Sequence, residues 1–232
     1  MIKQIPNIIT SLNLLCGCVA IIFAVSGDLV SACFFAFAGI FLDFFDGLAA
    51  RVLNAQSQVG LQLDSLADVV TSGVVPAIVM MQLLSRAFTG TNLEITTLFK
   101  DGLGNPSWMI YMPFIGLLIA VASGYRLAKF NVDTRQTTSF IGLPVPANTL
   151  LVLSLPLILS FQASQQITEF ILSPWFLIIL TLLSCVLLNA EIPLFALKFK
   201  TWNFKDNAVR YVFLICLLYT SDAADEHNCV DL

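Results

Sequence analysis

Four aspartates lie within two otherwise apolar stretches of the chain. Asp43 and Asp46 follow a run of Phe, Ala, Ile and Leu, and Asp64 and Asp68 stand among Leu, Ala and Val. Near a helix centre in a membrane each aspartate costs roughly 2.5–3.5 kcal/mol, so four clustered carboxylates would not stay ionised without cations. Oxygen ligands without histidine or cysteine favour a hard divalent ion. The sequence therefore predicts a site for two Mg²⁺ or Mn²⁺ ions, with Ca²⁺ also compatible with these ligands.

The spacing of the aspartates directs them toward one another. Asp43 and Asp46 are three residues apart in one predicted helix, and Asp64 and Asp68 are four apart in the next, so each pair shares a helix face. The short connection at 52–59 closes an antiparallel hairpin. At a rise of 1.5 Å per residue, Asp43 and Asp68 each lie about 12 Å from the hairpin end. We therefore expect the four carboxylates to meet at one level.

Small residues accompany the acidic face. Gly47 and Ala50 share the face of Asp43 and Asp46, and Gly60 lies one turn before Asp64. Residues without bulky side chains leave room for a ligand to lie against the backbone, although helix packing alone would also explain one or two of them.

Two other interpretations of the acidic hairpin stay open at this point. One is a surface turn in which aspartates cap helices. It suits Asp64 but not Asp43, which follows the apolar run at 33–42. The other is a proton or cation relay in a transporter. A relay needs acids along a path, whereas these four are expected at one depth.

The composition indicates the class of protein in which this hairpin lies. Of the 232 residues 58% are hydrophobic and 11% are charged, against about 25% charged residues in ordinary soluble domains. This excludes a soluble globular enzyme, a disordered chain and a nucleic-acid binder. The only histidine is His227, near the end of the chain, so a histidine base or ligand in the membrane body is also excluded.

The apolar runs predict an all-α membrane helix bundle of six to seven transmembrane helices. The first is expected to be an uncleaved helix rather than a signal peptide. The predicted spans are about 5–26, 29–52, 62–86, 108–130, 142–163, 171–197 and, in a short seventh helix, 207–220. Residues 1–220 then form a single transmembrane domain. The polar tail at 221–232, expected to be non-native or disordered, carries four acidic residues that account for the formal net charge of −4.

The basic residues predict the orientation of these spans. With the N-terminus in the cytoplasm, nine basic residues fall on the cytoplasmic side: Lys3, Arg51, Arg126, Lys129, Arg135, Lys198, Lys200, Lys205 and Arg210. Only Arg86 and Lys100 fall outside. This direction places the acidic hairpin near the cytoplasmic face.

The hairpin resembles the signature of the CDP-alcohol phosphatidyltransferase family, which the chain matches at every specified position: Asp43-x2-Asp46-Gly47-x2-Ala50-Arg51-x8-Gly60-x3-Asp64-x3-Asp68. Eight residues with fixed gaps make this a specific motif. Three further segments are similar to bacterial members of the family that use serine: Pro6-Asn7-x2-Thr10-x2-Asn13, Arg126-Leu-Ala-Lys-Phe-Asn131 and Phe140-Ile-Gly-Leu-Pro-Val-Pro146. The resemblance covers about residues 3–215.

The resemblance implies a reaction, namely transfer of the phosphatidyl group from CDP-diacylglycerol to an alcohol with release of CMP. L-serine is the expected acceptor, which would give phosphatidylserine, and glycerol 3-phosphate and inositol phosphate are the alternatives. By position in the motif, Asp43, Asp46 and Asp64 would bind the metal ions that hold the CDP diphosphate. Asp68 would complete the second metal site and act as general base on the acceptor hydroxyl.

The resemblance also implies the binding residues. The CDP group is expected to contact Asp46, Gly47, Ala50, Arg51, Gly60, Asn7 and Thr10. Arg126 and Lys129 are candidates for binding the acceptor, with membrane anchoring as the alternative role. The family further implies a homodimer in the bacterial cytoplasmic membrane, with the active site facing the cytoplasm.

Overall fold

A computed structural model of the chain describes residues 4–94, 108–132, 140–162, 164–191 and 193–194. The chain divides into two units, Met1–Leu194 and Phe195–Leu232. All described residues belong to the first unit. The predicted seventh span at 207–220 and the tail at 221–232 therefore lie outside the described residues.

The first two helices form an antiparallel hairpin. Helix α1 (Ile5–Val25) and helix α2 (Leu29–Val52) pack against each other along their lengths. Gly27 joins them with a φ of +85°, a left-handed conformation that glycine adopts without steric cost. Asp28 then caps α2, because its carboxylate accepts a 3.1 Å hydrogen bond from the backbone N–H of Ser31.

The next three helical segments are continuous and form one rod. Helix α3 (Gln58–Asp68) begins at Ser57, whose hydroxyl accepts a 3.0 Å hydrogen bond from the N–H of Gly60. The rod continues through a π-helical segment, η2 (Val69–Val74), into helix α4 (Val75–Thr89). It ends at Gly90, whose φ is +75°.

The rest of the described unit is also helical except for one short β pair. In chain order its elements are η3 (Trp108–Ile110), η4 (Met112–Leu117), α6 (Leu118–Val132), β1 (Phe140–Ile141), α7 (Val145–Phe161), α8 (Gln165–Ile171), α9 (Pro174–Asn189) and β2 (Pro193–Leu194). Strands β1 and β2 pair antiparallel over two residues each.

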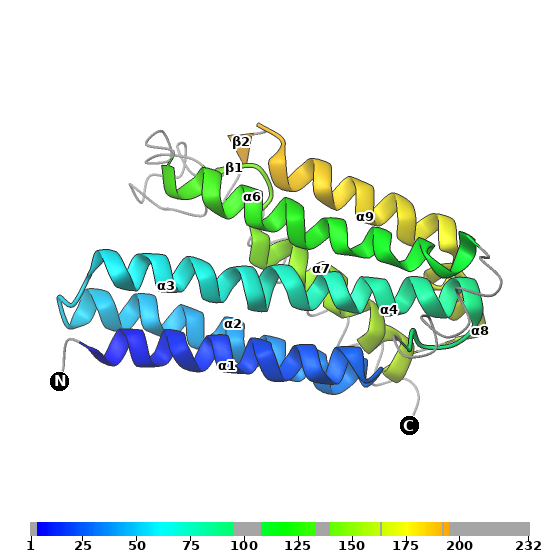
Figure 1. Ribbon diagram of the computed structural model, residues 1–232, viewed down its shortest axis with the longest axis horizontal. Helices are drawn as coiled ribbons and strands as arrows, with labels where there is room; N and C mark the ends of the chain where they lie inside the picture. Colours follow the sequence, from blue (N-terminus) through cyan, green and yellow to red (C-terminus); the bar gives the residue numbers. More distant parts are fainter. Residues whose placement is uncertain (1–3, 95–107, 133–139, 163, 192, 195–232) are drawn as a thin grey trace, which may run out of the picture. The chain divides into compact units, whose positions relative to one another are not determined.

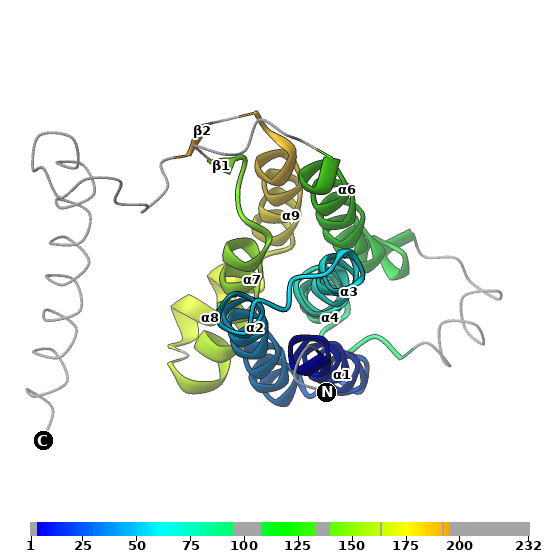
Figure 2. The same ribbon diagram turned by 90° about the vertical axis from the view of Figure 1, so that its left-hand side faces the viewer.

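The rod of α3, η2 and α4 lies between the other helices. Figure 1 shows α1 and α2 on one side of the rod and α6 and α9 on the other. Figure 2, a view along the helices from the end that carries the α2–α3 connection, shows α7 beside α2, and α7 also contacts α4. The rod is therefore the element around which the site residues on α1, α2 and α6 are placed.

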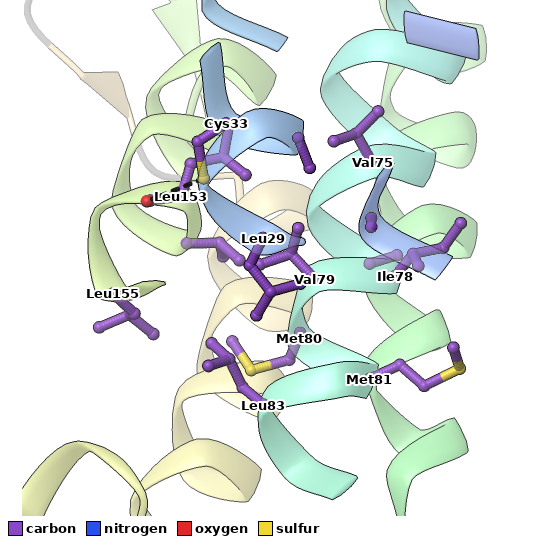
Figure 3. Packing of buried hydrophobic residues seen from close by; sticks show 14 of the residues in the cluster. Leu29, Cys33, Val75, Ile78, Val79, Met80, Met81, Leu83, Leu153 and Leu155 are labelled. Atoms are coloured by element: carbon purple, nitrogen blue, oxygen red, sulfur yellow. Dashed lines mark hydrogen bonds between the residues drawn. The ribbon is translucent and has the colours of Figure 1, made fainter. Parts of the chain in front are cut away.

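The core is centred on α4. All eleven residues at 75–85 are buried, and their apolar side chains pack against α1, α2, η4, α7 and α9. Figure 3 shows Val79 of α4 beside Leu29 of α2, and the Cys33 thiol of α2 donating to the Leu153 carbonyl of α7 at 3.4 Å. The outer helices instead expose large apolar side chains such as Phe34 and Phe41, as expected for a surface in contact with lipid.

The helical, membrane-type fold is confirmed. Among the described residues, four helical stretches are long and apolar enough to cross a membrane: Ile5–Val25, Leu29–Val52, Gln58–Thr89 and Met112–Val132. Helices α8 and α9 together could form a fifth span bent by 53°. Helix α7 has 17 residues, fewer than the roughly 20 of a full crossing. The six to seven spans and the cytoplasmic N-terminus stay predictions.

The sixth predicted span, 171–197, differs most from the structure. The helix starts at Pro174, because a proline has no N–H to continue α8 and is favoured in the first turn of a new helix. It ends at Asn189, eight residues before the predicted end, and the chain then enters β2 at Pro193.

Candidate active site

The acidic residues lie where α2 and α3 meet. Helix α2 ends at Val52 and α3 begins at Gln58, so a five-residue connection brings the two helices together. Asn54 in this connection has a φ of +47°, a left-handed turn conformation that asparagine tolerates better than most residues. The predicted hairpin is thus present, with a connection shorter than expected.

Three aspartates converge on one point. One carboxylate oxygen from each of Asp43, Asp46 and Asp64 lies within 4.8 Å of the other two. Asp43 is also within hydrogen-bonding reach of both Asp64 and Asp68. The structure therefore brings three of the four carboxylates together, and Asp68 lies next to this group rather than within it. So many like charges at such separations repel one another unless a cation or protons neutralise them.

Helix α1 fixes one of these carboxylates. The hydroxyl of Thr10 lies 2.5 Å from Oδ2 of Asp46 and donates to it, and it also lies 3.0 Å from the Pro6 carbonyl. Both Thr10 and Asp46 are buried. A buried carboxylate held by a hydroxyl has little freedom to rotate, so Asp46 presents its oxygens in a defined direction.

A cavity of about 460 Å³ opens beside the acidic cluster. It is lined by all seven residues expected to contact CDP: Asn7, Thr10, Asp46, Gly47, Ala50, Arg51 and Gly60. Asp64 also lines it, whereas Asp43 and Asp68 are not among the lining residues. The walls of the cavity are thus formed by α1 and by both helices of the acidic hairpin. Its size suits a ligand of nucleotide dimensions.

The two glycines in the cavity wall act differently. A Cβ built on Gly47 would meet no atom within 4 Å, so this position borders open space. A Cβ on Gly60 would lie 2.8 Å from Oδ1 of Asn7 and 3.0 Å from the hydroxyl of Ser57. Gly60 therefore permits the close approach of α1 and the start of α3, while Gly47 leaves space that a ligand can occupy.

Arg126 approaches the acidic cluster from α6. Its side chain is buried, with 8% exposed, and its guanidinium interacts electrostatically with Asp68. Within the described part of the chain, Nε of Arg126 has no hydrogen-bond partner. A buried arginine with a free donor beside a carboxylate is suited to binding an anionic group.

Lys129 is engaged elsewhere. Its ammonium donates to Oε1 of Glu191 at 3.0 Å and forms an ion pair with it. This pair connects α6 to the segment after α9. The structure therefore places Arg126, but not Lys129, beside the aspartates.

Several residues around the site were not predicted. Ala55, Gln56, Ser57, Gln58 and Leu61 also line the cavity. A serine directly before the first residue of a helical pattern is a capping signal, so Ser57 could have been placed at this end of the helix. The 2.9 Å hydrogen bond from Asn131 of α6 to the Ser65 hydroxyl of α3 joins residues 66 positions apart and has no local sequence signal.

Comparison with known proteins adds independent evidence. Residues 3–188 match the sequence profile of the family described as CDP-alcohol phosphatidyltransferase. A CDP-diacylglycerol–serine O-phosphatidyltransferase of Bacillus subtilis is 38% identical over 148 residues, which cover 62% of this chain and 70% of the relative. The enzyme of the same name from Helicobacter pylori is 29% identical over 219 residues, 93% of this chain and 79% of the relative. An archaetidylserine synthase of Methanothermobacter thermautotrophicus is 29% identical over 144 residues, 61% of this chain and 53% of the relative.

Proposed function

The chain belongs to the CDP-alcohol phosphatidyltransferase family, as its acidic motif predicted, and we propose that it transfers the phosphatidyl group of CDP-diacylglycerol to the hydroxyl of L-serine. The products would be phosphatidylserine and CMP. The observation that carries the proposal is the position of the Asp43–Asp46–Asp64 cluster beside a nucleotide-sized cavity, which Asp46 and Asp64 line.

The donor set of the cluster fits a hard divalent cation. Its three members are carboxylates whose oxygens lie within 4.8 Å of one another, the ligand chemistry that suits Mg²⁺ and Mn²⁺. Asp43, Asp46 and Asp64 would hold one ion, and Asp68, within reach of Asp43, would extend the set to a second. Ions bound there would neutralise the diphosphate of the donor and the departing CMP.

The cavity residues would bind and orient the donor. Gly47 leaves open space for the nucleotide, and Arg51 stands exposed at the cavity wall where it can meet a phosphate. Asn7 and Thr10 would hold the nucleotide from α1, with Thr10 also fixing the direction of Asp46. The lipid chains would lie against the apolar outer helices, so a site near the membrane interface serves both parts of the substrate.

Asp68 is the proposed general base. The serine oxygen would attack the phosphorus that carries the diacylglycerol while Asp68 accepts the hydroxyl proton. A new oxygen–phosphorus bond forms, the bond between this phosphorus and the oxygen of CMP breaks, and CMP leaves with the electron pair. A direct displacement is proposed because, among the described residues that line the cavity, no serine or cysteine is hydrogen-bonded to a base, and the Ser57 hydroxyl accepts from the N–H of Gly60 instead.

Serine is proposed as acceptor on two grounds. The relatives from Bacillus subtilis and Helicobacter pylori carry serine in their names. The buried guanidinium of Arg126, with a free Nε donor among the described residues, is suited to the carboxylate of serine. Glycerol 3-phosphate and inositol phosphate carry phosphate and would favour a denser group of basic side chains, whereas Lys129 is paired with Glu191.

The location and assembly are proposed with the function. The excess of basic residues on one side of the predicted spans supports a cytoplasmic N-terminus and an active site facing the cytoplasm of a bacterium. The family resemblance alone supports a homodimer.

One assay tests the proposal. The purified full-length protein is incubated with CDP-diacylglycerol, Mn²⁺ or Mg²⁺, and L-serine, glycerol 3-phosphate or inositol phosphate, and CMP and the lipid product are measured. We expect CMP release and phosphatidylserine with serine, and loss of both on adding EDTA and in the folded Asp68→Asn variant. A phosphorylated alcohol as the better substrate would contradict serine as acceptor. CMP release by none of the three alcohols would contradict the reaction.

A further inference from the structure

A π-helical turn lies immediately after Asp68. The segment Val69–Val74 has π geometry, and Thr71, Ser72 and Gly73 within it are buried. A π turn contains more residues than an α turn, is rare, and is found mostly as a single turn inside an α-helix, frequently at functional sites. The turn determines how Asp68 and the residues before it are rotated relative to α4, which is anchored in the core. Contacts that hold the turn therefore affect the direction of Asp68.

One such contact comes from α1. The hydroxyl of Thr71 lies 2.8 Å from Oδ1 of Asn13 and 3.3 Å from the Asn13 carbonyl, and it donates toward both. Both side chains are fully buried. Asn13 belongs to the N-terminal segment that resembles the family, but it does not line the cavity, and the proposed reaction gives it no role.

Glycines allow three elements to meet at this pair. A Cβ on Gly17 of α1 would lie 2.5 Å from the Thr71 hydroxyl oxygen. A Cβ on Gly39 of α2 would lie 2.7 Å from the Thr71 methyl carbon and 2.9 Å from Oδ1 of Asn13. Side chains at either position would push the π turn away from α1 and α2. The Asn13–Thr71 pair is thus enclosed on two sides without room to shift.

This enclosed pair lies about one helical turn from three residues of the site. Asn13 follows Thr10 by three residues on α1, and Thr71 follows Asp68 by three. On α2, Gly39 precedes Asp43 by four residues, about 6 Å along the helix axis. A displacement at the pair would therefore be transmitted to the cluster through rigid helix.

A second contact holds the π turn from α7. The hydroxyl of Thr149 donates to the carbonyl of Ser72 at 2.6 Å, and Thr149 is fully buried. The turn is consequently bound on one side by α1 and on another by α7. These two contacts come from helices that are 136 residues apart at Asn13 and Thr149.

The need to fill space in the core does not explain why Asn13 and Thr71 are polar. Within the described part of the chain, the amide nitrogen of Asn13 has no hydrogen-bond partner. A buried donor without a partner lowers stability, and two apolar residues of similar shape would avoid this cost. Packing alone therefore does not account for an amide and a hydroxyl at this position, which is three residues from Thr10 on α1 and three from Asp68.

We propose that Asn13 and Thr71 are positioning residues, which hold the π turn so that Asp68 and Asp43 stay directed at the metal-binding cluster. Neither residue touches the substrate in this scheme. The inference rests on the proposed function, because it assumes that the cluster binds divalent ions. It goes further in assigning the geometry of that cluster to a hydrogen bond outside it.

The test measures Mn²⁺ binding by the purified full-length protein, from the loss of the electron paramagnetic resonance signal of free Mn²⁺. Thr71→Val removes the hydroxyl and keeps the shape, and it should weaken Mn²⁺ binding roughly ten- to a hundredfold, the usual effect of losing a contact that orients metal ligands. Thr71→Ser keeps the hydroxyl and should restore most of the affinity.

Thr181→Val is the matched control. Thr181 is equally buried, and among the residues that the structure describes its hydroxyl bonds only to the Leu177 carbonyl of its own helix, at 2.8 Å. This variant should bind Mn²⁺ as the unmodified protein does. If Thr71→Val does not fold, Thr149→Val replaces it, because it removes the other contact to the π turn. We expect it to weaken Mn²⁺ binding relative to Thr181→Val.

The outcomes separate the possible explanations. Mn²⁺ affinity in Thr71→Val equal to that of the unmodified protein would overturn the inference, as would an equal loss in Thr181→Val or no recovery in Thr71→Ser. If the unmodified protein binds no Mn²⁺, both the inference and the proposed metal site fail. If it binds Mn²⁺ and Thr71→Val weakens binding, but no alcohol releases CMP, the inference stands and the proposed reaction fails.

Discussion

Thr10 and Asp46 join the first helix to the acidic hairpin through a 2.5 Å hydrogen bond in which the threonine hydroxyl donates to the carboxylate. Both residues are buried, with 3% and 5% of their surfaces exposed. A carboxylate that is out of water needs such partners to stay ionised and oriented. Helix α1 is therefore part of the candidate active site as well as part of its support.

Replacing Thr10 by valine removes this hydrogen bond and preserves the shape of the side chain. A hydrogen bond to a charged group contributes about 1.5–3 kcal/mol, so we expect Thr10→Val to lower kcat/KM for CDP-diacylglycerol roughly tenfold to a hundredfold. The measurement is the initial rate of CMP release at several donor concentrations. Thr10→Ser keeps the hydroxyl and should retain most of the activity. Normal kcat/KM in Thr10→Val would show that Asp46 does not need this partner.

Gly47 offers a test of the cavity. Alanine at this position meets no neighbouring atom in the folded protein, and it should raise helix stability by roughly 0.5–1 kcal/mol. The added methyl group would project into the space assigned to the nucleotide. A misplaced methyl group costs about 1–3 kcal/mol of binding, so we expect the KM for CDP-diacylglycerol to rise roughly tenfold or more.

Gly124→Ala is the matched control for this variant. Gly124 lies within α6, and a Cβ there also meets no atom within 4 Å. It does not line the cavity, so the substitution should stabilise the helix without changing the KM. Equal KM values in Gly47→Ala and the unmodified protein would show that the nucleotide does not bind in this cavity.

The acidic hairpin could be predicted from the sequence because local rules determine it. Spacings of three residues in α2 and four in α3 place each pair of aspartates on one face, and a five-residue connection fixes how the helices face each other. These local rules suffice to predict that Asp43, Asp46 and Asp64 lie together. The cavity could be anticipated for the same reason, because Gly47 and Gly60 occupy those faces.

The contacts of the site with other helices could not be predicted in this way. The π turn after Asp68 changes the phase of the helix, and an assumed α periodicity would rotate Thr71 away from its observed place against Asn13. The pair of Lys129 and Glu191 joins residues 62 positions apart, and nothing near Lys129 in the sequence distinguishes this partner from the membrane interface.

Variants of Arg126 test whether this residue binds the acceptor or the donor. Arg126→Ala removes the guanidinium proposed to meet the carboxylate of serine, and loss of a charged hydrogen bond of about 1.5–3 kcal/mol should raise the KM for serine roughly tenfold or more. The KM for CDP-diacylglycerol should change less, and it is measured in the same assay. Arg126→Lys keeps the charge without the planar pair of donors, so it should recover only part of the serine affinity. A larger rise in the KM for CDP-diacylglycerol would assign Arg126 to the donor phosphate instead.

Gln82 tests whether the scaffold can be weakened without changing the site. It lies on α4, fourteen residues after Asp68, which is about 20 Å along the rod. Its buried amide donates to the carbonyls of Val25 at 3.2 Å and Leu93 at 3.3 Å, and its oxygen accepts from the N–H of Leu93 at 2.8 Å. It therefore ties the end of α1 and the segment after α4 to the core at the end of the bundle away from the aspartates.

Gln82→Leu would take these partners from the partly buried carbonyl of Val25 and from the buried carbonyl and N–H of Leu93, and a buried backbone group without a partner costs about 1–3 kcal/mol. We expect a clear drop in the thermal unfolding midpoint of the detergent-solubilised protein. The KM values of the folded protein for both substrates should be unchanged, because the acidic cluster is supported by α1, α2 and the π turn. Gln166→Leu, the same substitution at an exposed position on α8, should leave both the midpoint and the KM values as they are. A higher KM for CDP-diacylglycerol in Gln82→Leu would show that the two ends of the rod are coupled. It would contradict the expectation that α1, α2 and the π turn hold the acidic cluster independently of the far end of the rod.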